Sequence, residues 1–321
     1  MTYDLDFERP LAELEKRIQS LRSKRPEKIN TSEIASLEQE LSERTAEIYS
    51  GLTPWQRVLV ARHKNRPYTA DYIRFLFNDF FEMRGDRAFG DDHAILTGIA
   101  SFNGQTVVII GNQKGRDIKE KQECNFGLAH PEGYRKAQRV MQHAEKFGFP
   151  VITFVDTAGA FPGLESEERG ISEAIADNLL LMAVLRTPIV SIVIGEGGSG
   201  GALGIGVADR TLMMENSVYT VAAPEAAASI LWKDSSFAHQ AAEAMKITAD
   251  DLYHLKLIDG IVPEPIGGAH KDPRTAANYV GEALKEEMRY VQAISLDMLL
   301  EQRYQKLRSI GAPDSLAALK R

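Results

Sequence analysis

The sequence contains one cysteine, Cys124, and this scarcity excludes two kinds of structure. A single cysteine forms no disulfide within the chain and builds no cysteine-based zinc site. A chain without disulfides suits a reducing compartment. The acidic N-terminal residues also carry no apolar signal segment, so we expect a cytoplasmic protein.

Long apolar segments and an excess of positive charge are missing as well. The longest apolar run, Leu179–Leu185, is far shorter than the about 20 residues that a membrane-spanning helix needs. The net charge is −7, so the broad basic surface of a nucleic-acid-binding protein is not expected. The chain has 321 residues, of which 44% are hydrophobic, and this is enough for a large buried core.

Two common catalytic motifs are also absent. No G-K-[ST] sequence follows the glycine-rich part of the chain, which excludes a Walker-type ATP site. There is no H-E-x-x-H motif either, so the sequence predicts no metal on this chain.

Apolar segments alternate with glycine loops and helical segments through the middle of the chain. We expect buried strands at residues 106–110, 151–155 and 189–194, and helices at residues 132–147 and 166–185. This alternation is typical of an α/β fold whose mainly parallel sheet is covered on both faces. The second and third strands share one plan, in which a proline precedes an apolar strand and a glycine loop. Their loops should therefore leave the sheet at one edge, where α/β folds bind ligands.

Helical segments flank this region. Apolar residues at helical spacing predict two helices within residues 1–50, and a break at Pro26–Asn30 makes them a hairpin. The hairpin either covers this chain's own core or docks on another subunit, because periodicity does not separate the two. The aromatic segment 73–81 is expected to be helical, a helix is expected after Pro224, and residues 272–304 form a largely helical tail.

The segment from Gly195 to Gly206 is the strongest functional signal in the sequence. A strand enters it, and a helix is expected to begin near Gly200, so the first N–H groups of that helix have no partner. Such N–H groups, together with the helix dipole, favour a negatively charged oxygen. Glycine also lets a ligand approach the backbone closely. The segment therefore predicts an anion site built from backbone amides.

A serine hydrolase is the alternative interpretation of the same segment. Residues Gly197–Gly201 fit the G-x-S-x-G pattern with Ser199 as the nucleophile. Asp234, His239 and His254 follow in the order that such hydrolases use. However, a segment this rich in glycine can match the pattern by chance.

Two further motifs are weaker. Residues Gly195–Gly200 fit the dinucleotide pattern G-x-G-x-x-G with Glu215 as the downstream acid, but glycines interrupt the helix that follows. Residues Ala244–Ile247 resemble a biotin-attachment sequence. Their surroundings favour a helix, so we interpret Lys246 as a helix-end residue.

Several motifs keep a specific order and spacing over nearly the whole chain. They are Asn125–Gly127, Pro131–Ala137, Asp156–Gly163, Glu167–Gly170, Gly195–Leu203, Leu231–Lys233 and Glu264–His270. Together they resemble the alpha subunit of the bacterial acetyl-coenzyme A carboxylase carboxyltransferase.

The resemblance implies a crotonase/ClpP-like α/β fold of repeated β-β-α units that form a spiral. It divides the chain into a partner-docking helical hairpin at residues 1–50, a crotonase-like carboxyltransferase domain at residues 51–265 and a helical extension at residues 266–321. The implied reaction moves the carboxyl group of carboxybiotin to acetyl-coenzyme A and gives malonyl-coenzyme A for fatty acid biosynthesis.

The resemblance also implies partners. Carboxybiotin arrives on the biotin carboxyl carrier protein, and the biotin carboxylase partner uses ATP to make it. A beta subunit that carries a zinc ribbon completes the active site, and the assembly is an α2β2 heterotetramer.

Site residues follow from the same resemblance. Gly200 and Gly201 supply amides to the ureido oxygen of biotin, and Gly197 and Gly198 belong to the same substrate-binding segment. Gly159, in the parallel loop, is expected to shape the same pocket.

A basic cluster and four departures complete the prediction. Lys114 and Arg116, with Lys119–Lys121, either receive the charge of coenzyme A or the carrier protein or form a solvated loop. The residues that depart from the common family sequence are Ala158, Phe161, Ala223 and Ala226. Alanine in place of a serine N-cap weakens the start of a helix by about 1 kcal/mol.

Overall fold

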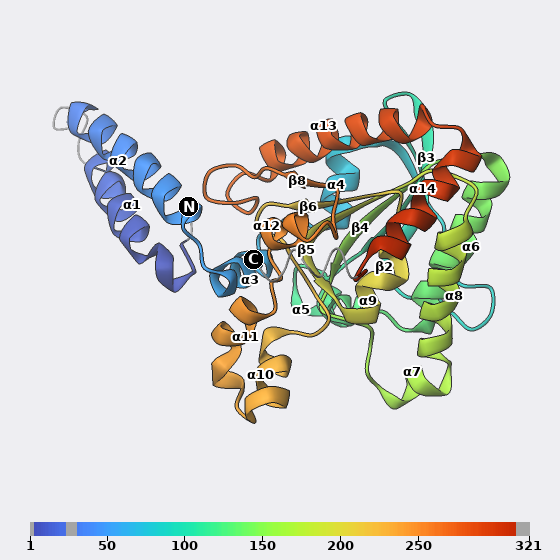
Figure 1. Cartoon of the computed structure of the whole chain (residues 1–321). Helices are drawn as coiled ribbons and strands as arrows, with labels where there is room; N and C mark the ends of the chain where they lie inside the picture. The colour runs from blue at the N-terminus through green and yellow to red at the C-terminus, as the bar shows by residue number, and fades with distance from the viewer. Residues whose placement is uncertain (1–2, 24–30, 313–321) are drawn as a thin grey trace.

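The computed structural model describes residues 3–23 and 31–312, and a mixed sheet lies at the centre of this part of the chain (Figure 1). Among the described residues the sheet has eight strands in the order β1-β2-β3-β4-β5-β6-β8, with β7 paired to β5. The strands are β1 Asn78–Glu82, β2 Ile95–Phe102, β3 Gln105–Asn112, β4 Val151–Thr157, β5 Ile189–Gly198, β6 Arg210–Met214, β7 Val218–Thr220 and β8 Gly260–Val262.

The strand directions change at β3. Strands β1 to β3 pair antiparallel, whereas the pairs from β3 to β8 are parallel. Strand β5 pairs with β6 over residues 190–193 and with β7 over residues 196–198. The sheet therefore branches at the carboxyl half of β5, directly before the helix of the glycine-rich segment.

Helices cover both faces of the sheet (Figure 1). Helices α6, α8 and α9 pack on one face, and α4 and α13 pack on the other. The α-helices are α1 Arg9–Arg22, α2 Thr31–Ser50, α3 Pro54–Ala61, α4 Thr69–Leu76, α5 Ile118–Glu123, α6 Pro131–Phe147, α7 Leu164–Glu168, α8 Ile171–Val184, α9 Ser199–Gly206, α10 Pro224–Trp232, α11 Ala238–Ala244, α12 Ala249–His254, α13 Pro273–Gln292 and α14 Leu296–Ser309.

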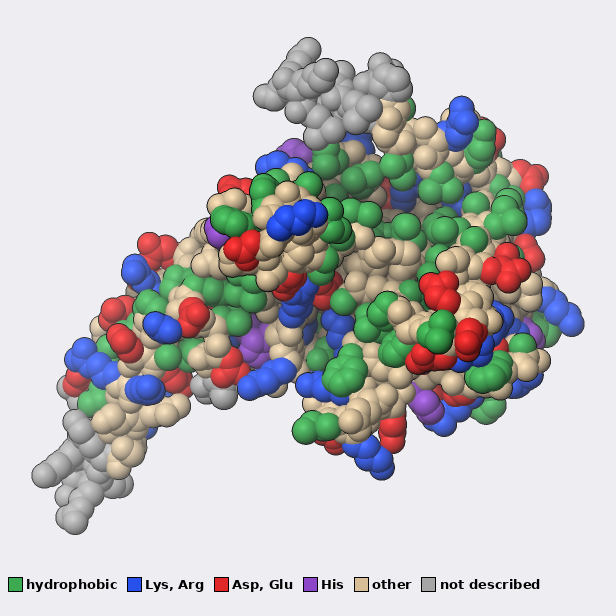
Figure 2. Space-filling model, turned by 90° about the horizontal axis from the view of Figure 1, so that it is seen from below, with side chains coloured by type: hydrophobic (Ala, Val, Ile, Leu, Met, Phe, Trp, Pro, Cys, Tyr) green, Lys and Arg blue, Asp and Glu red, His purple; other side chains and the backbone are tan. Residues whose placement is uncertain are grey.

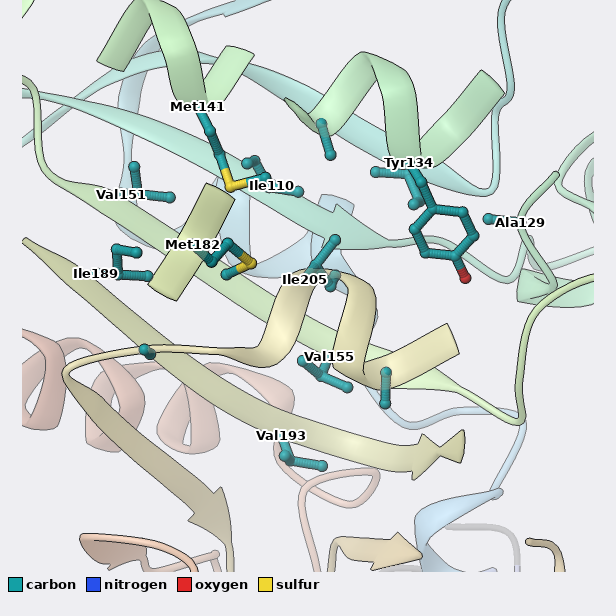
Figure 3. Close-up of a cluster of buried hydrophobic side chains, with 14 of the residues drawn as sticks. Ile110, Ala129, Tyr134, Met141, Val151, Val155, Met182, Ile189, Val193 and Ile205 are labelled. Carbon is teal, nitrogen blue, oxygen red and sulfur yellow. The ribbon is translucent and has the colours of Figure 1, made fainter. Parts of the chain in front are cut away.

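Alternate residues of the central strands enter two separate cores, as the period of two requires. In β3, Ile110 belongs to the core under α6, α8 and α9, and Ile109 belongs to the core under α4 and α13. Figure 3 shows Met141 and Met182 pointing from the helices toward the strands of the first core. The prediction of an α/β fold with helices on both faces of a mainly parallel sheet is confirmed.

Three predicted strands and the basic helix lie where the sequence indicates, but two predicted helices are wrong in part. The helix expected over residues 73–81 ends at Leu76, because residues 78–82 pair with β2 as an edge strand. The helix expected over residues 166–185 is divided between α7 and α8. Gly170 separates them with a φ of 77°, a left-handed conformation that a helix interior does not contain.

The N-terminal hairpin consists of α1 and α2, which pack together through Ile18, Leu21, Ile34 and Leu37. The predicted break at Pro26–Asn30 lies outside the described residues. The hairpin projects away from the sheet, and acidic and basic side chains are mixed over its surface (Figures 1 and 2). It does not cover the sheet, so the interpretation as a lid over this chain's own core is not supported.

The C-terminal helices share the core of the sheet. Helix α13 contributes Val280 and Leu284 to the second core. On α14, the buried guanidinium of Arg303 donates to Asp209 and to the carbonyl oxygens of Met182 and Leu185. Within the described part of the chain, no helix has the length and apolar character needed to span a bilayer.

Candidate active site

The carboxyl ends of β3, β4 and β5 meet at one edge of the sheet. The three strands are parallel neighbours, so their carboxyl ends lie together. Thr157 at the end of β4 pairs with Gly197 near the end of β5. The prediction that the chain leaves the second and third strands at one edge of the sheet is confirmed, but only β4 is followed by a loop.

Helix α9 begins directly at the end of β5, without an intervening loop. Gly198 is the N-cap residue, and no side chain caps the helix. The first N–H groups of a helix have no acceptor within it, and in the described part of the chain no other group accepts from the Gly200 or Gly201 amide. Ser199 has a φ of 52°, which is unusual for a residue with a side chain. Gly200 is partly exposed, whereas Gly201 is buried.

Close backbone packing explains several of the glycines. A Cβ atom at Gly201 would lie 2.5 Å from the carbonyl oxygen of Gly159, and one at Gly198 would overlap the Ala158 carbonyl. The N-terminus of α9 therefore rests directly on the loop after β4. Gly200 and Gly159 differ, because a Cβ at Gly200 would make only an ordinary contact of 3.6 Å with Ile175, and one at Gly159 would have no neighbour within 4 Å.

A buried ion pair lies beneath this segment. The Nζ atom of Lys114 is 2.6 Å from Oδ1 of Asp156, and the side chains are 16% and 1% exposed. Asp156 Oδ1 also accepts the backbone N–H of Glu196 at 2.9 Å. Burial alone would lower the pKa of Lys114, but the charges of Asp156 and Glu196 outweigh burial, so the pKa is raised and the ammonium stays charged.

A second set of charges connects this edge to α10. Arg62 donates to Glu196 at 2.6 Å and to Glu225 in the first turn of α10 at 2.6 Å. Burial lowers the pKa of Arg62, and the hydrogen bonds and charges of the two glutamates raise it by more. Arg116 is engaged elsewhere: it donates to the carbonyl oxygens of Lys64 and Arg66, pairs with Asp71 and stacks on Tyr68.

The loop after α5 is strained where it reaches the site. Asn125, Phe126 and Gly127 have φ values of 46°, 55° and 83°, so three consecutive residues are left-handed. The Thr157 hydroxyl oxygen is 2.6 Å from the carbonyl oxygens of both Gly127 and Gly159, and its single hydrogen is shared between these two acceptors. The Phe126 side chain remains 60% exposed. Strain of this kind is concentrated at functional sites.

An apolar groove of about 520 Å³ runs along α9 from its N-terminus. Ser199 and Gly200 lie at the start of the helix that lines it. Its apolar walls include Leu203, Tyr219, Leu307 and Ile310. The groove thus combines apolar walls with the unpaired backbone amide of Gly200, as small-molecule sites commonly combine apolar walls with a few polar groups.

The residues of the serine hydrolase alternative are not connected. Asp234 accepts from the Ser236 amide, His254 contacts the Asp250 carbonyl oxygen, and His239 is exposed. Over residues 3–23 and 31–312, no hydrogen bond joins Ser199 to Asp234 or to either histidine.

Lys246 follows the end of α11, as predicted for a helix-end residue, and its side chain is 58% exposed. No cluster of three or more histidine, cysteine, aspartate or glutamate side chains suited to a metal ion lies in the described ranges.

The residues that differ from the common family sequence also have clear positions. The Phe161 ring contacts the His130 ring at a tilt of 31°, with ring centroids 4.2 Å apart. Ala223 is the N-cap of α10 and provides no side-chain cap, as expected, while Pro224 occupies the first turn. Ala226 lies within the same helix.

Comparison with known proteins agrees with this geometry. The family described as acetyl co-enzyme A carboxylase carboxyltransferase-like matches residues 4–311. The acetyl-coenzyme A carboxylase carboxyl transferase subunit alpha of Heliobacterium modesticaldum is 56% identical over 97% of this chain and 93% of its own length. This chain belongs to the acetyl-coenzyme A carboxylase carboxyltransferase alpha-subunit family.

Solved structures show the fold. A Pseudomonas malonate decarboxylase hetero-tetramer in complex with coenzyme A contains a chain that matches with a TM-score of 0.58 and 18% identity, over 72% of this chain and 90% of that one. Transcarboxylase 12S, with methylmalonyl-coenzyme A and methylmalonic acid bound, matches with a TM-score of 0.56 and 19% identity, over 69% of this chain and 42% of that one. The crotonase-like fold prediction is confirmed, and the comparisons give no support to the serine hydrolase.

Sequence reasoning missed the buried charges of the site. Asp156 belongs to one of the family motifs, but it lies in β4, Glu196 lies in β5 and Lys114 lies in the loop after β3, so their contacts join segments that are far apart in the sequence. A carboxylate directly after the apolar strand at residues 151–155 was the available signal. The exposed, strained Phe126 gave no signal beyond its motif.

Proposed function

We propose that this chain forms the biotin-facing half of a carboxyltransferase active site, with the Gly200 and Gly201 amides as oxyanion donors. The observation that carries the proposal is the start of α9, where these amides have no acceptor among the described residues and where Gly200 lines an apolar groove. Carboxybiotin supplies the carboxyl group, and its ureido oxygen becomes negative as that group leaves. Fixed N–H donors stabilise such a charge most strongly where water is excluded.

The groove along α9 suits a ring of this kind. Leu203, Tyr219 and Ile310 provide apolar contact, and Gly200 places an amide at the helix start. Gly159 has open space on the side where other residues carry a Cβ atom, and we propose that the ligand occupies this space. Gly197 and Gly198 then hold the backbone in place, since Tyr219 and the Ala158 carbonyl leave no room for side chains there.

A second subunit completes the site. We propose a zinc-ribbon beta subunit that binds acetyl-coenzyme A and supplies the donors for the thioester oxygen, in an α2β2 assembly in the cytoplasm. The biotin carboxyl carrier protein brings carboxybiotin, which the biotin carboxylase forms with ATP. The hairpin of α1 and α2 extends away from the sheet and packs through its own apolar cluster, so it suits a docking arm for another subunit (Figure 1).

The decisive experiment is the reverse reaction with purified components. Malonyl-coenzyme A and a free biotin analogue are incubated with this chain alone, with the beta subunit alone and with both. We expect carboxylation of the analogue only with both subunits. No turnover with a beta subunit that is active with another alpha subunit would contradict the proposal.

Ser199→Ala is the matched control. The variant removes the hydroxyl but keeps every backbone amide of α9. We expect a small effect on transfer, because the proposed donors are the N–H groups of Gly200 and Gly201. A loss of turnover as large as 10²-fold, which removal of a single oxyanion donor can cause, would instead assign the chemistry to the hydroxyl.

A further inference from the structure

We propose that Lys114 and Asp156 are positioning residues that hold the backbone of the glycine-rich segment, and that Lys114 does not bind the charge of coenzyme A. The inference rests on the proposed function, because it assigns a role at the same site. For Lys114 it replaces both interpretations that the sequence leaves open for the basic cluster, because the side chain neither receives an outside charge nor belongs to a solvated loop.

Asp156 lies at the centre of the arrangement. Its Oδ1 atom accepts the Glu196 N–H at 2.9 Å and the Lys114 ammonium at 2.6 Å, and its own N–H donates to Asn112 Oδ1 at 3.1 Å. A Cβ atom at Gly195 would overlap its carboxylate. The end of β5 is therefore seated directly on this side chain, three residues before α9 begins.

Lys114 connects a second loop to the same carboxylate. Its Cγ atom would lie 2.7 Å from a Cβ atom at Gly127, so the stem of the side chain passes directly beneath the strained turn. The carbonyl oxygen of Gly127 in turn lies 2.6 Å from the Thr157 hydroxyl, which is equally close to the Gly159 carbonyl oxygen. One buried lysine thus joins the loops after β3 and α5 to the loop after β4 and to the end of β5.

The same contacts exclude a role in binding a phosphate. The ammonium is 2.6 Å from a carboxylate that is 1% exposed, and the Lys114 side chain itself is 16% exposed. By contrast Lys119 is 85% exposed and lies 3.9 Å from Glu123. A phosphate site in this cluster would depend on residues such as Lys119, and its affinity would fall as salt screens the charge.

The test compares Lys114→Met, Lys114→Arg, Asp156→Asn, Lys119→Met and the double variant Lys114→Met/Asp156→Asn in the complete complex. Lys285→Met, an exposed lysine on α13, controls for the loss of one charge. For Lys114→Met we expect kcat to fall by about 10–100-fold, as a misplacement near 1 Å would cause. We expect KM for malonyl-coenzyme A to change by less than about threefold, with no change in its dependence on ionic strength.

Two results separate positioning from a merely structural role. Lys114→Arg keeps the charge beside Asp156 and should recover part of kcat. The double variant keeps an acceptor for the Glu196 N–H without a buried charge, so it should fold even where Lys114→Met does not, and its kcat effect should be smaller than the sum of the single effects.

A readout in the free chain keeps this inference separate from the proposed function. Hydrogen exchange at the Glu196 amide should be at least about tenfold faster in Lys114→Met, because the acceptor loses its counter-ion. If the wild-type complex shows no turnover, the proposed function fails and exchange alone decides. Unchanged exchange, or a salt-dependent rise in KM shared by Lys114→Met and Lys119→Met, would overturn the inference.

Discussion

Replacing Gly201 by alanine tests the packing of α9 on the loop after β4. The new Cβ would lie 2.5 Å from the Gly159 carbonyl oxygen and 2.6 Å from the Ala160 nitrogen. The nearest atom, the Gly159 carbonyl carbon, would be only 2.2 Å away, so the helix start must move by about 1.2 Å to reach an ordinary contact of 3.4 Å. Overpacking of this size costs about 1–3 kcal/mol, from which the better helix propensity of alanine recovers at most about 1 kcal/mol.

The displacement should affect turnover more than stability. A shift near 1 Å in groups that position a reaction costs about 10²-fold, so we expect kcat for carboxyl transfer to fall by that order. The melting temperature of the free chain should fall by a few degrees, at about 2–4 °C per kcal/mol for a domain of 150–250 residues. Thermal unfolding followed by circular dichroism and the reverse transfer assay measure the two effects.

Gly200→Ala is the matched control for Gly201→Ala. Its Cβ would meet Ile175 at 3.6 Å, which is an ordinary contact, and its φ is not left-handed. The melting temperature should stay unchanged or rise, because alanine stabilises a helix relative to glycine by about 1 kcal/mol. A Gly201→Ala variant with the wild-type melting temperature and turnover, or a Gly200→Ala variant that unfolds more easily than Gly201→Ala, would refute the packing argument.

Three further predictions follow from strain, open space and buried histidine. Phe126 has a left-handed backbone conformation, which costs about 1–2 kcal/mol for a residue with a side chain, so Phe126→Gly should not lower the melting temperature. If the exposed ring contacts substrate, kcat/KM of the variant should fall. A fall in both the melting temperature and kcat/KM would identify the ring as structural. Gly159→Ala adds a methyl group where no atom lies within 4 Å, so stability should be kept and KM for the biotin analogue should rise; an unchanged KM would place the ligand elsewhere. Burial, and to a smaller extent the nearby positive charge of His63, lowers the pKa of His270 to about 3. Below about pH 6.5 the unfolded chain therefore binds a proton at this residue that the folded chain does not bind. The free energy of unfolding should fall by up to about 1.4 kcal/mol per pH unit as the pH is lowered to about 3. Both ring nitrogens of His270 lack partners within the described ranges, so urea unfolding of His270→Phe at pH 7 and pH 5 should show a smaller loss than in the wild type; an equal loss would assign the acid sensitivity to other groups.

The central strands could be predicted from the sequence because each is a short apolar run with a glycine or proline at its end. Residues 151–155 and 189–194 are buried on both faces, so their composition alone identifies them. Strand β1 could not be found in this way, because residues 78–82 are partly exposed and contain aromatic residues, as α4 does. Pairing with β2 decides the conformation there, and this contact is not local in the sequence.

The candidate site could be predicted in part for a similar reason. The local sequence of the glycine-rich segment is enough to predict a helix start with unpaired amides, and Gly200 lies where this helix start was expected. The role of Lys114 could not be predicted, because the local sequence around it is compatible both with an exposed basic cluster and with a buried ion pair. Only the fold brings its ammonium to Asp156, a residue 42 positions further along the chain.

The glycines of the site divide into two groups, and the division sharpens which of them concern a ligand. Gly198 and Gly201 are required by the fold, since neighbouring backbone leaves no space for a Cβ atom at either position. Their presence is therefore no evidence of ligand contact. At Gly159 neither close packing nor a left-handed φ requires glycine, so the fold alone does not explain why this position lacks a side chain. A ligand that approaches the backbone closely gives a reason for glycine at that position. The loop after β4, as well as the start of α9, is thus expected to face the transferred group.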